Sequence, residues 1–397
     1  MRPTPAVLCL SLVLVSTLFA PGGTGVASSG AGSIEKVWSF TREGSEATIW
    51  KLAWSPDGSM IASSFFDSAV IVLDARTGTV VKELDLSTPR TRCDGFSPPG
   101  TTPVRAVAFS GDGKYLAAAG DDLLVHVFSV PDWTEKYTFK GHTGSVLCLD
   151  FSPDSKYLAS GSGTDKVIPQ NAGENVTRIW DLSTGEETLV LRGHRDGVLA
   201  VEWSEKGDRI ATVSDDRTVR VWSFPAGGLL VNVTGHTSGV LDVDWSPDGS
   251  RLITGSRDYK IKVWNSTTGE QIATWPDYNC VRSVDYHPDG TLVATSGVDL
   301  TLKLRDPASG TALKVVKDGV EQHAMVMCSR WSPDGTYLAT ALGKSHTVIV
   351  YTFGGGEGGG GGIDMKPITL SVMAVIFTAF SVYLLYSAWR EIRRRRP

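Results

Sequence analysis

Short apolar runs alternate with polar turns along most of this chain, and one arrangement of them recurs. Each copy has an apolar run ending in an aromatic residue, then Ser-Pro-Asp-Gly or a relative, a small-residue run, an Asp-containing turn and another run often ending in Trp. Short runs of strand-forming residues bounded by such turns predict β-strands. The aromatic residues that close the first run are Trp54, Phe109, Phe151, Trp203, Trp245, Tyr286 and Trp331.

The spacing of these seven aromatic residues predicts the architecture. Successive members are separated by 55, 42, 52, 42, 41 and 45 residues. A period of about 42 residues with four short strands per unit is typical of a β-propeller. We therefore expect an all-β, seven-bladed propeller over residues 34–353. The last copy supplies only three strands, and Ile34–Phe40 is expected to be its missing outer strand, which would close the ring.

The two ends of the chain carry targeting signals. An apolar run over Ala6–Ala20, followed by small residues, predicts a signal peptide over residues 1–27, with an uncleaved anchor as the alternative. Residues 354–367 are glycine-rich and predict a flexible linker. Residues 368–389 are 22 residues without a formal charge and predict a transmembrane helix rather than a buried helix of the propeller. The Arg-rich residues 390–397 then form a cytoplasmic tail.

These signals predict a single-pass membrane protein that contacts the bilayer through its C-terminal helix. The propeller would lie outside the cytoplasm. Three sequons, at Asn175, Asn232 and Asn265, are compatible with glycosylation there. A reversed topology stays open, in which the N-terminal segment is not exported and a cytosolic regulatory propeller sits on the C-terminal anchor.

The charge of the chain bears on its partners, and its cysteines bear on disulfides and metal sites. The formal net charge is −5 and five Arg lie in the C-terminal tail, so the propeller is acidic, with no basic stripe in its sequence. We therefore expect no nucleic-acid partner. Cys148 and Cys328 share a register in two distant blades and are expected to be buried apolar residues, whereas Cys93 in a polar loop is a candidate reactive or paired thiol. Cysteine and histidine spacings predict no metal site, and no cofactor is expected.

Recurring dipeptides connect the sequence to a known family. Gly-His occurs at 141–142, 193–194 and 235–236, and Trp closes matching strands at Trp180, Trp222 and Trp264. These motifs resemble the WD-repeat family over about residues 35–353. The resemblance implies a structural tetrad in blades 4 and 5, in which histidine bridges a turn aspartate, a strand hydroxyl and the tryptophan indole. The implied sets are His194, Thr212, Asp216 and Trp222, and His236, Thr254, Asp258 and Trp264.

These sets contain the residue types of a catalytic triad. Because the spacing recurs from blade to blade and ends on Trp, we interpret them as structural. Other blades depart from the pattern, with Ala118 and Phe128 in blade 2, Arg305 in blade 6, and Leu73 and Tyr351 in blades 1 and 7. We expect those blades to be held together by packing.

Two deviations from the period nominate a binding face. A long connection enters blade 2, and about ten residues are inserted between the second and third strands of blade 3. Because strand direction alternates, both insertions are expected on one face of the ring, opposite the C-terminal linker. Such loops either bind a partner or are tolerated surface insertions. The predicted protein-binding residues are Arg90, Arg92, Phe96, Lys166, Gln170 and Asn171.

The innermost strands carry a row of acidic residues. Asp150, Glu202, Asp244 and Asp285 share one register, which holds Arg330 in blade 7. One interpretation is that these carboxylates bind a cation or a polar ligand. The other is that they are solvated, or paired with arginine, along a wet channel. Nucleotide-binding and nucleophile motifs do not occur, so we expect an interaction scaffold and not an enzyme. The alternative is a ligand- or metal-binding sensor or an enzyme that uses this acidic channel.

Overall fold

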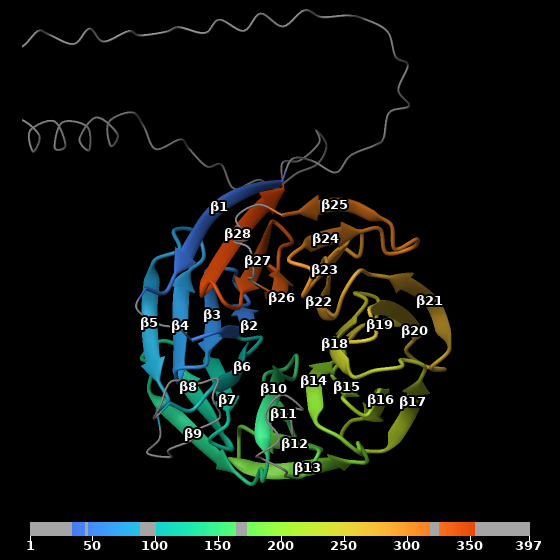
Figure 1. The fold of residues 1–397 in the computed structure, drawn as a ribbon. Coiled ribbons are helices and arrows are strands. Elements are labelled where there is room, and N and C mark those ends of the chain that lie inside the picture. Colours follow the sequence, from blue (N-terminus) through green and yellow to red (C-terminus); the bar gives the residue numbers. More distant parts are fainter. Residues whose placement is uncertain (1–33, 44–46, 88–100, 164–172, 318–324, 354–397) are drawn as a thin grey trace, which may run out of the picture. The chain divides into compact units, whose positions relative to one another are not determined.

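A ring of seven β-sheets surrounds a central channel (Figure 1). The computed structural model describes residues 34–43, 47–87, 101–163, 173–317 and 325–353. Every sheet has four antiparallel strands, which confirms the all-β, seven-bladed propeller. The predicted signal peptide, linker, transmembrane helix and tail lie outside the described residues. Within those residues, no helix is long and apolar enough to cross a membrane.

Blades 1 to 3 follow one another in chain order, and in each the first strand lines the channel. Blade 1 contains β2 (Ile49–Trp54), β3 (Met60–Phe65), β4 (Ala69–Asp74) and β5 (Val80–Asp85). Blade 2 contains β6 (Val104–Phe109), β7 (Tyr115–Gly120), β8 (Leu124–Ser129) and β9 (Glu135–Lys140). Blade 3 contains β10 (Ser145–Phe151), β11 (Tyr157–Gly163), β12 (Val176–Asp181) and β13 (Glu186–Arg192).

Blades 4 to 6 repeat this order. Blade 4 contains β14 (Val198–Trp203), β15 (Arg209–Ser214), β16 (Thr218–Ser223) and β17 (Leu229–Thr234). Blade 5 contains β18 (Val240–Trp245), β19 (Arg251–Ser256), β20 (Lys260–Asn265) and β21 (Gln271–Pro276). Blade 6 contains β22 (Val281–Tyr286), β23 (Val293–Gly297), β24 (Leu302–Arg305) and β25 (Ala312–Val316).

Blade 7 joins the two ends of the propeller. It contains β26 (Val326–Trp331), β27 (Tyr337–Leu342) and β28 (Thr347–Phe353), and its outer strand is β1 (Ile34–Thr41) from the start of the described chain. In this pairing Ile34 lies opposite Phe353 and Thr41 opposite Thr347. The Trp38 indole also donates to the carbonyl of Ala75 in blade 1, at 2.8 Å. The predicted closure by the N-terminal strand is therefore confirmed, and β1 additionally joins blade 7 to blade 1.

Strand direction gives the ring two distinct faces. We call upper the face that carries the connections between blades and the turns between second and third strands. The lower face carries the Ser-Pro-Asp-Gly turns and the turns between third and fourth strands. Because β28 runs antiparallel to β1, both Ile34 and Phe353 lie at the lower face. Both ends of the propeller therefore leave its lower face side by side.

The apolar core lies between neighbouring blades. One cluster joins blades 3 and 4 through buried residues that include Ile179, Val201, Trp203 and Trp222. Comparable clusters join the other blades around the ring. Burial of such large apolar surfaces is the main favourable term in folding. Each sheet thus depends on its neighbours for its core, as a closed ring requires.

Side-chain hydrogen bonds shape the lower-face turns. In blade 5, Asp248 Oδ1 accepts from Ser246 Oγ at 2.6 Å and from the Ser250 amide at 3.0 Å. Gly249 follows with a φ of 68°, a conformation that costs glycine little. The same local chemistry explains why the Ser-Pro-Asp-Gly motif predicted a turn.

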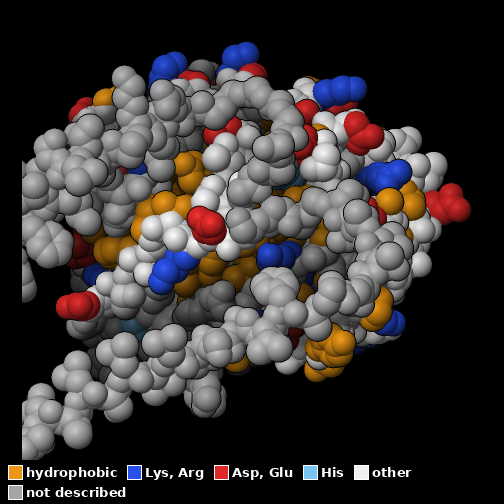
Figure 2. Space-filling model, turned by 90° about the horizontal axis from the view of Figure 1, so that it is seen from above, with side chains coloured by type: hydrophobic (Ala, Val, Ile, Leu, Met, Phe, Trp, Pro, Cys, Tyr) orange, Lys and Arg blue, Asp and Glu red, His pale blue; other side chains and the backbone are white. Residues whose placement is uncertain are grey.

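The rim of the ring carries charges of both signs. Figure 2 views the rim from the side of β1 and β25, where lysine, arginine and acidic side chains lie among hydrophobic ones. Val37, Leu313 and Val315 of the outer strands are exposed on this rim. Exposed apolar residues scattered in this way are ordinary for a soluble surface and do not by themselves mark a binding site.

Candidate functional site

The His-Thr-Asp sets of blades 4 and 5 are hydrogen-bonded within the protein. In blade 4, His194 Nε2 lies 2.9 Å from Thr212 Oγ1, and its Nδ1 lies 3.0 Å from Asp216 Oδ2. The Trp222 indole donates to the same Thr212 oxygen at 2.8 Å. The histidine comes from the connection before the blade, so each set fixes that connection to an upper-face turn.

Blade 5 repeats this geometry. His236 lies 2.8 Å from both Thr254 Oγ1 and Asp258 Oδ2, and the Trp264 indole donates to Thr254 at 2.9 Å. Burial favours a raised pKa for Asp258, but the hydrogen bonds from His236 and the Thr237 amide hold that pKa at about 2. Burial lowers the pKa of His194 in the matching set. A histidine with a lowered pKa and both nitrogens engaged is suited to a structural role.

Blade 3 contains three members of such a set among its described residues. His142 Nε2 lies 2.6 Å from Ser160 Oγ, which also accepts from the Trp180 indole at 2.8 Å. The fourth position falls within residues 164–172, outside the described part of the chain. Burial, with the nearby Arg178 guanidinium, lowers the pKa of His142 to about 3.

Blade 6 corrects an expectation from the sequence. Packing alone was expected to hold the blades that lack a tetrad, but Arg305, at the tryptophan position, donates to Thr295 at 3.0 Å and to Asp277 at 2.5 Å. Asp277 occupies the histidine position and also pairs with Lys303, which reaches Asp299 at 2.6 Å. These side chains are at most 16% exposed. An ionic network therefore replaces the histidine-tryptophan set.

Blade 2 departs from the expectation in a different way. His126 lies 2.8 Å from Asp122 through Nε2 and 2.6 Å from Glu135 through Nδ1. Burial acts to lower the pKa of His126, but hydrogen bonds and charge from the two carboxylates outweigh it and raise the pKa. The expectation that packing alone holds blade 2 together is therefore also wrong. In blade 1, Leu73 is fully buried in the core, as the expectation required.

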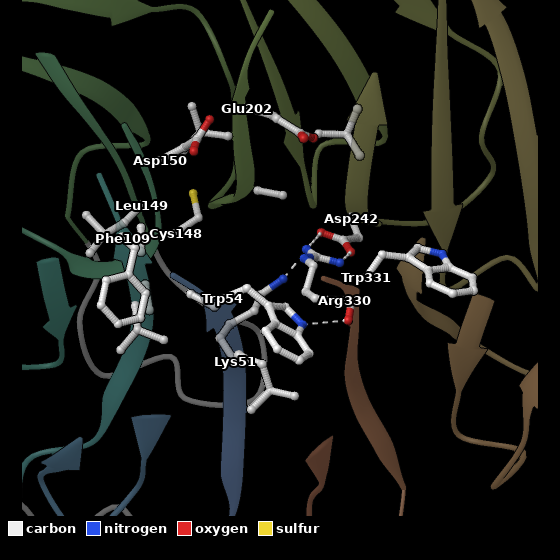
Figure 3. Close-up of a pocket in the computed structure, with 18 residues that line it drawn as sticks. Lys51, Trp54, Phe109, Cys148, Leu149, Asp150, Glu202, Asp242, Arg330 and Trp331 are labelled. Atoms are coloured by element: carbon white, nitrogen blue, oxygen red, sulfur yellow. Dashed lines mark hydrogen bonds and ion pairs between the residues drawn. The ribbon is translucent and has the colours of Figure 1, made fainter. Parts of the chain in front are cut away.

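Two members of the acidic row, Asp150 and Glu202, line the central cavity (Figure 3). Carboxylates of the row hold neighbouring blades together. Asp150 accepts from the Trp203 amide at 2.7 Å, Asp285 from the Trp331 amide at 2.6 Å, and Asp244 from the Tyr286 amide. Each bond joins the innermost strand of one blade to that of the next. The sequence predicted the shared register but not these bonds.

Two cations from distant strands meet one carboxylate of the channel. Arg330 donates to both oxygens of Asp242, at 3.0 and 3.2 Å, and Lys51 approaches the same carboxylate at 3.3 Å. Figure 3 shows Lys51 and Arg330 directed toward Asp242 at one side of the cavity. Within the row, the arginine-paired interpretation applies to Asp285, whose Oδ1 lies 3.8 Å from Arg330 Nε. Lys51 was not predicted, because it lies outside the register of the row, three residues before Trp54 rather than one.

The remaining channel carboxylates have raised pKa values. Burial raises the pKa of Asp150 to about 7 and that of Asp244 to about 6. Burial and the charges of Asp244 and Asp150 raise the pKa of Glu202, and burial raises that of Asp285. The cavity that Asp150 and Glu202 line measures about 240 Å³. Within the described residues, no cluster of three or more metal-ligating side chains suited to an ion occurs.

The upper end of the channel is narrower. Its cavity of about 30 Å³ is lined by four apolar side chains, those of Leu147, Leu199, Leu241 and Met327, together with Trp50, Lys51, Arg257 and Arg282. Trp50 lies beside this opening between two guanidinium groups, 5.3 Å from Arg105 and 4.8 Å from Arg282. These positions lie at one register of different blades. Pattern analysis missed the cluster because leucine, arginine, tryptophan and methionine all occur at this register in different blades.

The predicted partner-binding residues Arg90, Arg92, Phe96, Lys166, Gln170 and Asn171 all lie outside the described residues, as does Cys93. The ends of both insertions are described and lie at the upper face. The Thr102 amide donates to Ser68 Oγ at 2.6 Å, and the Glu174 amide to Thr143 Oγ1 at 2.9 Å. Each bond ties an insertion end to another upper-face segment.

The three sequon asparagines differ in environment. Asn232 is exposed on the outer strand β17. Asn265 is half-buried, and its side-chain oxygen accepts from the Thr267 and Thr268 amides, both at 2.9 Å. Asn175 is also half-buried, and its Oδ1 is enclosed by protein. Cys148 and Cys328 are buried with free thiols, and burial raises the pKa of Cys148 to about 12.

Family models match most of the ring. The WD domain, G-beta repeat, matches residues 92–129, 133–168, 185–223, 227–265, 269–306 and 314–352. The chain belongs to the WD-repeat family. The anaphase-promoting complex subunit 4 WD40 domain matches residues 32–98, which adds the first WD blade. A WD-repeat propeller of this kind is suited to binding protein partners.

Several curated proteins share part of this WD-repeat region. Coronin-7 of Mus musculus is 32% identical over 150 residues, which is 35% of this chain and 15% of the relative. Nuclear distribution protein PAC1 of Coccidioides posadasii is 29% identical over 179 residues, 42% of this chain and 35% of the relative. WD repeat-containing protein WDS homolog of Arabidopsis thaliana is 27% identical over 193 residues, 45% of this chain and 32% of the relative. The chain thus matches only a minor part of each of these relatives.

Proposed function

We propose that this protein is a membrane-tethered WD-repeat scaffold whose propeller binds protein partners outside the cytoplasm. The observation that carries the proposal is the separation of the two faces. Both ends of the propeller, Ile34 and Phe353, meet at the lower face. Both insertions depart from the upper face. A tether attached below leaves the upper face accessible to a partner.

The rigidity of the scaffold supports this role. The polar sets of blades 4, 5 and 6 each fix an upper-face turn to the connection that precedes it. Loops held on a rigid framework lose less conformational freedom when they bind, which favours affinity. The proposed contact is the pair of insertions in blades 2 and 3, whose described ends are tied to other upper-face segments by the Thr102 and Glu174 amides.

Orientation rests on the two termini. The apolar N-terminal run, the uncharged segment over residues 368–389 and the five arginines after it together favour export of the propeller and a cytoplasmic tail. The exposed sequon at Asn232 is compatible with that placement. The reversed topology, with a cytosolic propeller, makes the opposite prediction in the same experiment.

Protease protection in sealed vesicles tests the orientation. An epitope tag inserted near Asn171 and a second tag after Pro397 report on opposite sides of the membrane. We expect external protease to remove the first tag in right-side-out vesicles and to spare the second until detergent is added. Protection of the Asn171 tag with digestion of the tail would establish the cytosolic propeller instead.

Paired loop deletions test the scaffold. Residues 90–98 and 166–171 are replaced by short Gly-Ser linkers in the full chain, and proteins that co-purify with the wild type are compared with those of the variant. We expect the partners to be lost while the thermal unfolding midpoint stays unchanged. A matched deletion of residues 355–360 in the linker controls for shortening the chain. Retention of every partner by the loop variant would contradict the proposal.

The channel offers less support for a ligand sensor. Asp150, Asp244 and Asp285 accept main-chain amides, and Asp242 is paired with Arg330 and Lys51. A ligand would have to compete with bonds that join the blades. We therefore assign these carboxylates to the framework of the ring.

A further inference from the structure

Blades 4 and 5 present exposed cations on the upper face of an otherwise acidic protein. Arg195 lies in the connection into blade 4, Arg217 in the upper-face turn of the same blade, and Lys260 at the upper end of β20. All three are exposed, and among the described residues none of them forms an ion pair. The sequence shows no basic stripe because these residues are far apart in the chain.

The acidic residues of the two upper-face turns, Asp216 and Asp258, are directed into the protein, whereas Asp196, next to Arg195 in the connection, is half-buried. Asp216 precedes Arg217 but bonds to His194 and to the Arg195 amide, both within 3.0 Å. Asp258 precedes Tyr259 and bonds to His236 at 2.8 Å. In each tetrad the carboxylate of the turn therefore points into the protein, and the residue that follows it, Arg217 or Tyr259, is exposed at the surface. That arrangement separates the charges, with cations outside.

Two tyrosines continue this surface toward blade 6. Tyr259 is 49% exposed and Tyr278 is 90% exposed. Their backbones are joined, since the Asp277 amide donates to the Tyr259 carbonyl at 2.8 Å. Lys303 Nζ lies 5.4 Å from the centre of the Tyr278 ring. We call Arg195, Arg217, Tyr259, Lys260 and Tyr278 the upper-face strip.

Ionic bonds hold the strip in place across three neighbouring blades (Figure 1). Arg257, two residues before Tyr259, donates to both oxygens of Asp215 in blade 4, at 2.8 and 2.9 Å. Asp277, one residue before Tyr278, belongs to the ionic network of blade 6. The turns that carry the strip are thus fixed by ion pairs that are partly or largely buried.

We propose that the upper-face strip binds an acidic segment of a protein partner. This inference rests on the proposed scaffold function and adds a second partner contact of stated chemistry, on blades 4 to 6, to the insertions of blades 2 and 3. Arginine and tyrosine are enriched at protein-binding hot spots. A carboxylate of the partner segment can pair with the two-pronged arginine guanidinium, while tyrosine covers apolar side chains next to that carboxylate. The cations of the strip attract an acidic segment, and the acidic remainder of the protein repels it. Binding of such a segment is therefore restricted to this face.

The test uses the full chain in detergent and a fluorescent twelve-residue peptide of alternating Glu and Leu. Fluorescence anisotropy at increasing salt gives its affinity. A peptide with Lys in place of Glu, a single-stranded oligothymidine and phosphatidylserine vesicles are the competing probes. We expect the Glu peptide to bind most tightly, with affinity that falls as salt rises.

Two variants and one control place the binding. The Arg195→Glu/Arg217→Glu variant should weaken binding at least about tenfold, because attraction becomes repulsion, and Tyr278→Ala should weaken it less. Lys206→Glu changes an exposed cation of the lower-face turn in the same blade and should leave binding unchanged. Thermal unfolding midpoints of all variants should match the wild type, since the substituted side chains are exposed.

Three results would overturn the inference. The first is equal binding of the Glu and Lys peptides, and the second is unchanged binding by the double variant. The third is tighter binding of the oligonucleotide or the vesicles through the same arginines, which would assign the strip to nucleic acid or membrane. The scaffold proposal fails separately, because its test deletes residues 90–98 and 166–171 and leaves the strip intact.

Discussion

Arg305 and Asp277 of blade 6 occupy the positions that tryptophan and histidine hold in the tetrad of blade 5, and they form an ion pair there. Arg305 takes the register of Trp264, and Asp277 that of His236. The guanidinium donates to Thr295, as the indole does to Thr254 in blade 5. One blade therefore ties its entering connection to its third strand through a buried ion pair, where another uses a histidine, a threonine hydroxyl and an indole.

Removal of one ion should destabilise this blade. We expect Asp277→Ala to lower the free energy of unfolding by roughly 3–5 kcal/mol, because Arg305 then remains buried without its carboxylate. Urea unfolding followed by tryptophan fluorescence measures the change.

The exchange also predicts a rescue. The Asp277→His/Arg305→Trp variant rebuilds the set of blade 5 around Thr295 and Asp299, so it should be more stable than Asp277→Ala. Arg305→Trp alone, which leaves Asp277 with Lys303 only, serves as the single-substitution control. A double variant as unstable as Asp277→Ala would show that the two blades do not use equivalent positions.

Channel carboxylates predict a pH dependence. Burial raises the pKa of Asp150 to about 7, although the Arg330 charge acts to lower it. The unfolded value is about 4, so between about pH 4 and pH 7 the folded protein holds a proton that the unfolded chain releases. This contribution to stability is complete below about pH 4 and is lost as pH rises through about 7.

The Asp150→Asn variant isolates that contribution. The side-chain oxygen of the new asparagine can still accept the hydrogen bond from the Trp203 main-chain N–H, but the side chain does not titrate. As pH rises from 5 to 8, the wild type should lose stability relative to the variant, as measured by urea unfolding at each pH. Asp248→Asn is the control, since hydrogen bonds from Ser246 and Ser250 hold the pKa of Asp248 at about 2. A constant difference between wild type and Asp150→Asn would contradict the assignment.

Deletion of residues 34–41 should destabilise the whole propeller. The variant loses β1, which covers the edge of β28 and bonds to blade 1 through Trp38. We expect a lower thermal unfolding midpoint and concentration-dependent association, because an uncovered strand edge pairs with other chains. Differential scanning fluorimetry and light scattering measure the two effects. Deletion of residues 354–361 removes as many residues from the linker and should change neither.

Sequon use should follow exposure. If the propeller is exported, Asn232 on the outer strand should be glycosylated, and Asn175 should not, because Thr177 of its sequon is buried in β12 whereas Thr234 of the Asn232 sequon is exposed. Expression in secretory cells followed by glycosidase digestion should show a mobility shift that Asn232→Gln abolishes and Asn175→Gln preserves. Glycosylation at Asn175 but not at Asn232 would contradict this accessibility argument.

Local patterns predicted the parts of the fold that local chemistry determines. The aromatic residue that ends each innermost strand and the Ser-Pro-Asp-Gly turn after it marked all seven blades. Ile34–Phe40 was identified as the closing strand because the last copy lacked one. These signals sit within a few residues of the element that they specify, so a single sequence contains them.

Polar networks within blades were predicted only where they repeat. His194 and His236 recur at the same spacing from their partners, but Asp277 and Arg305 occur once and resemble surface charges in the sequence. The acidic composition likewise concealed the upper-face strip, because its arginines come from a connection and a turn 22 positions apart. The net charge sums over the whole chain, so it cannot show a basic patch that folding assembles on one face.

By itself, the sequence determined the number of blades, the turns and the closure of the ring, because strand periodicity and turn chemistry act between near neighbours. Tertiary structure alone decided which charges meet. Lys51 and Asp242 are 191 positions apart and come together only because the ring brings β2 and β18 to one channel. Electrostatic pairing depends on distance in space, which the order of residues along the chain does not give.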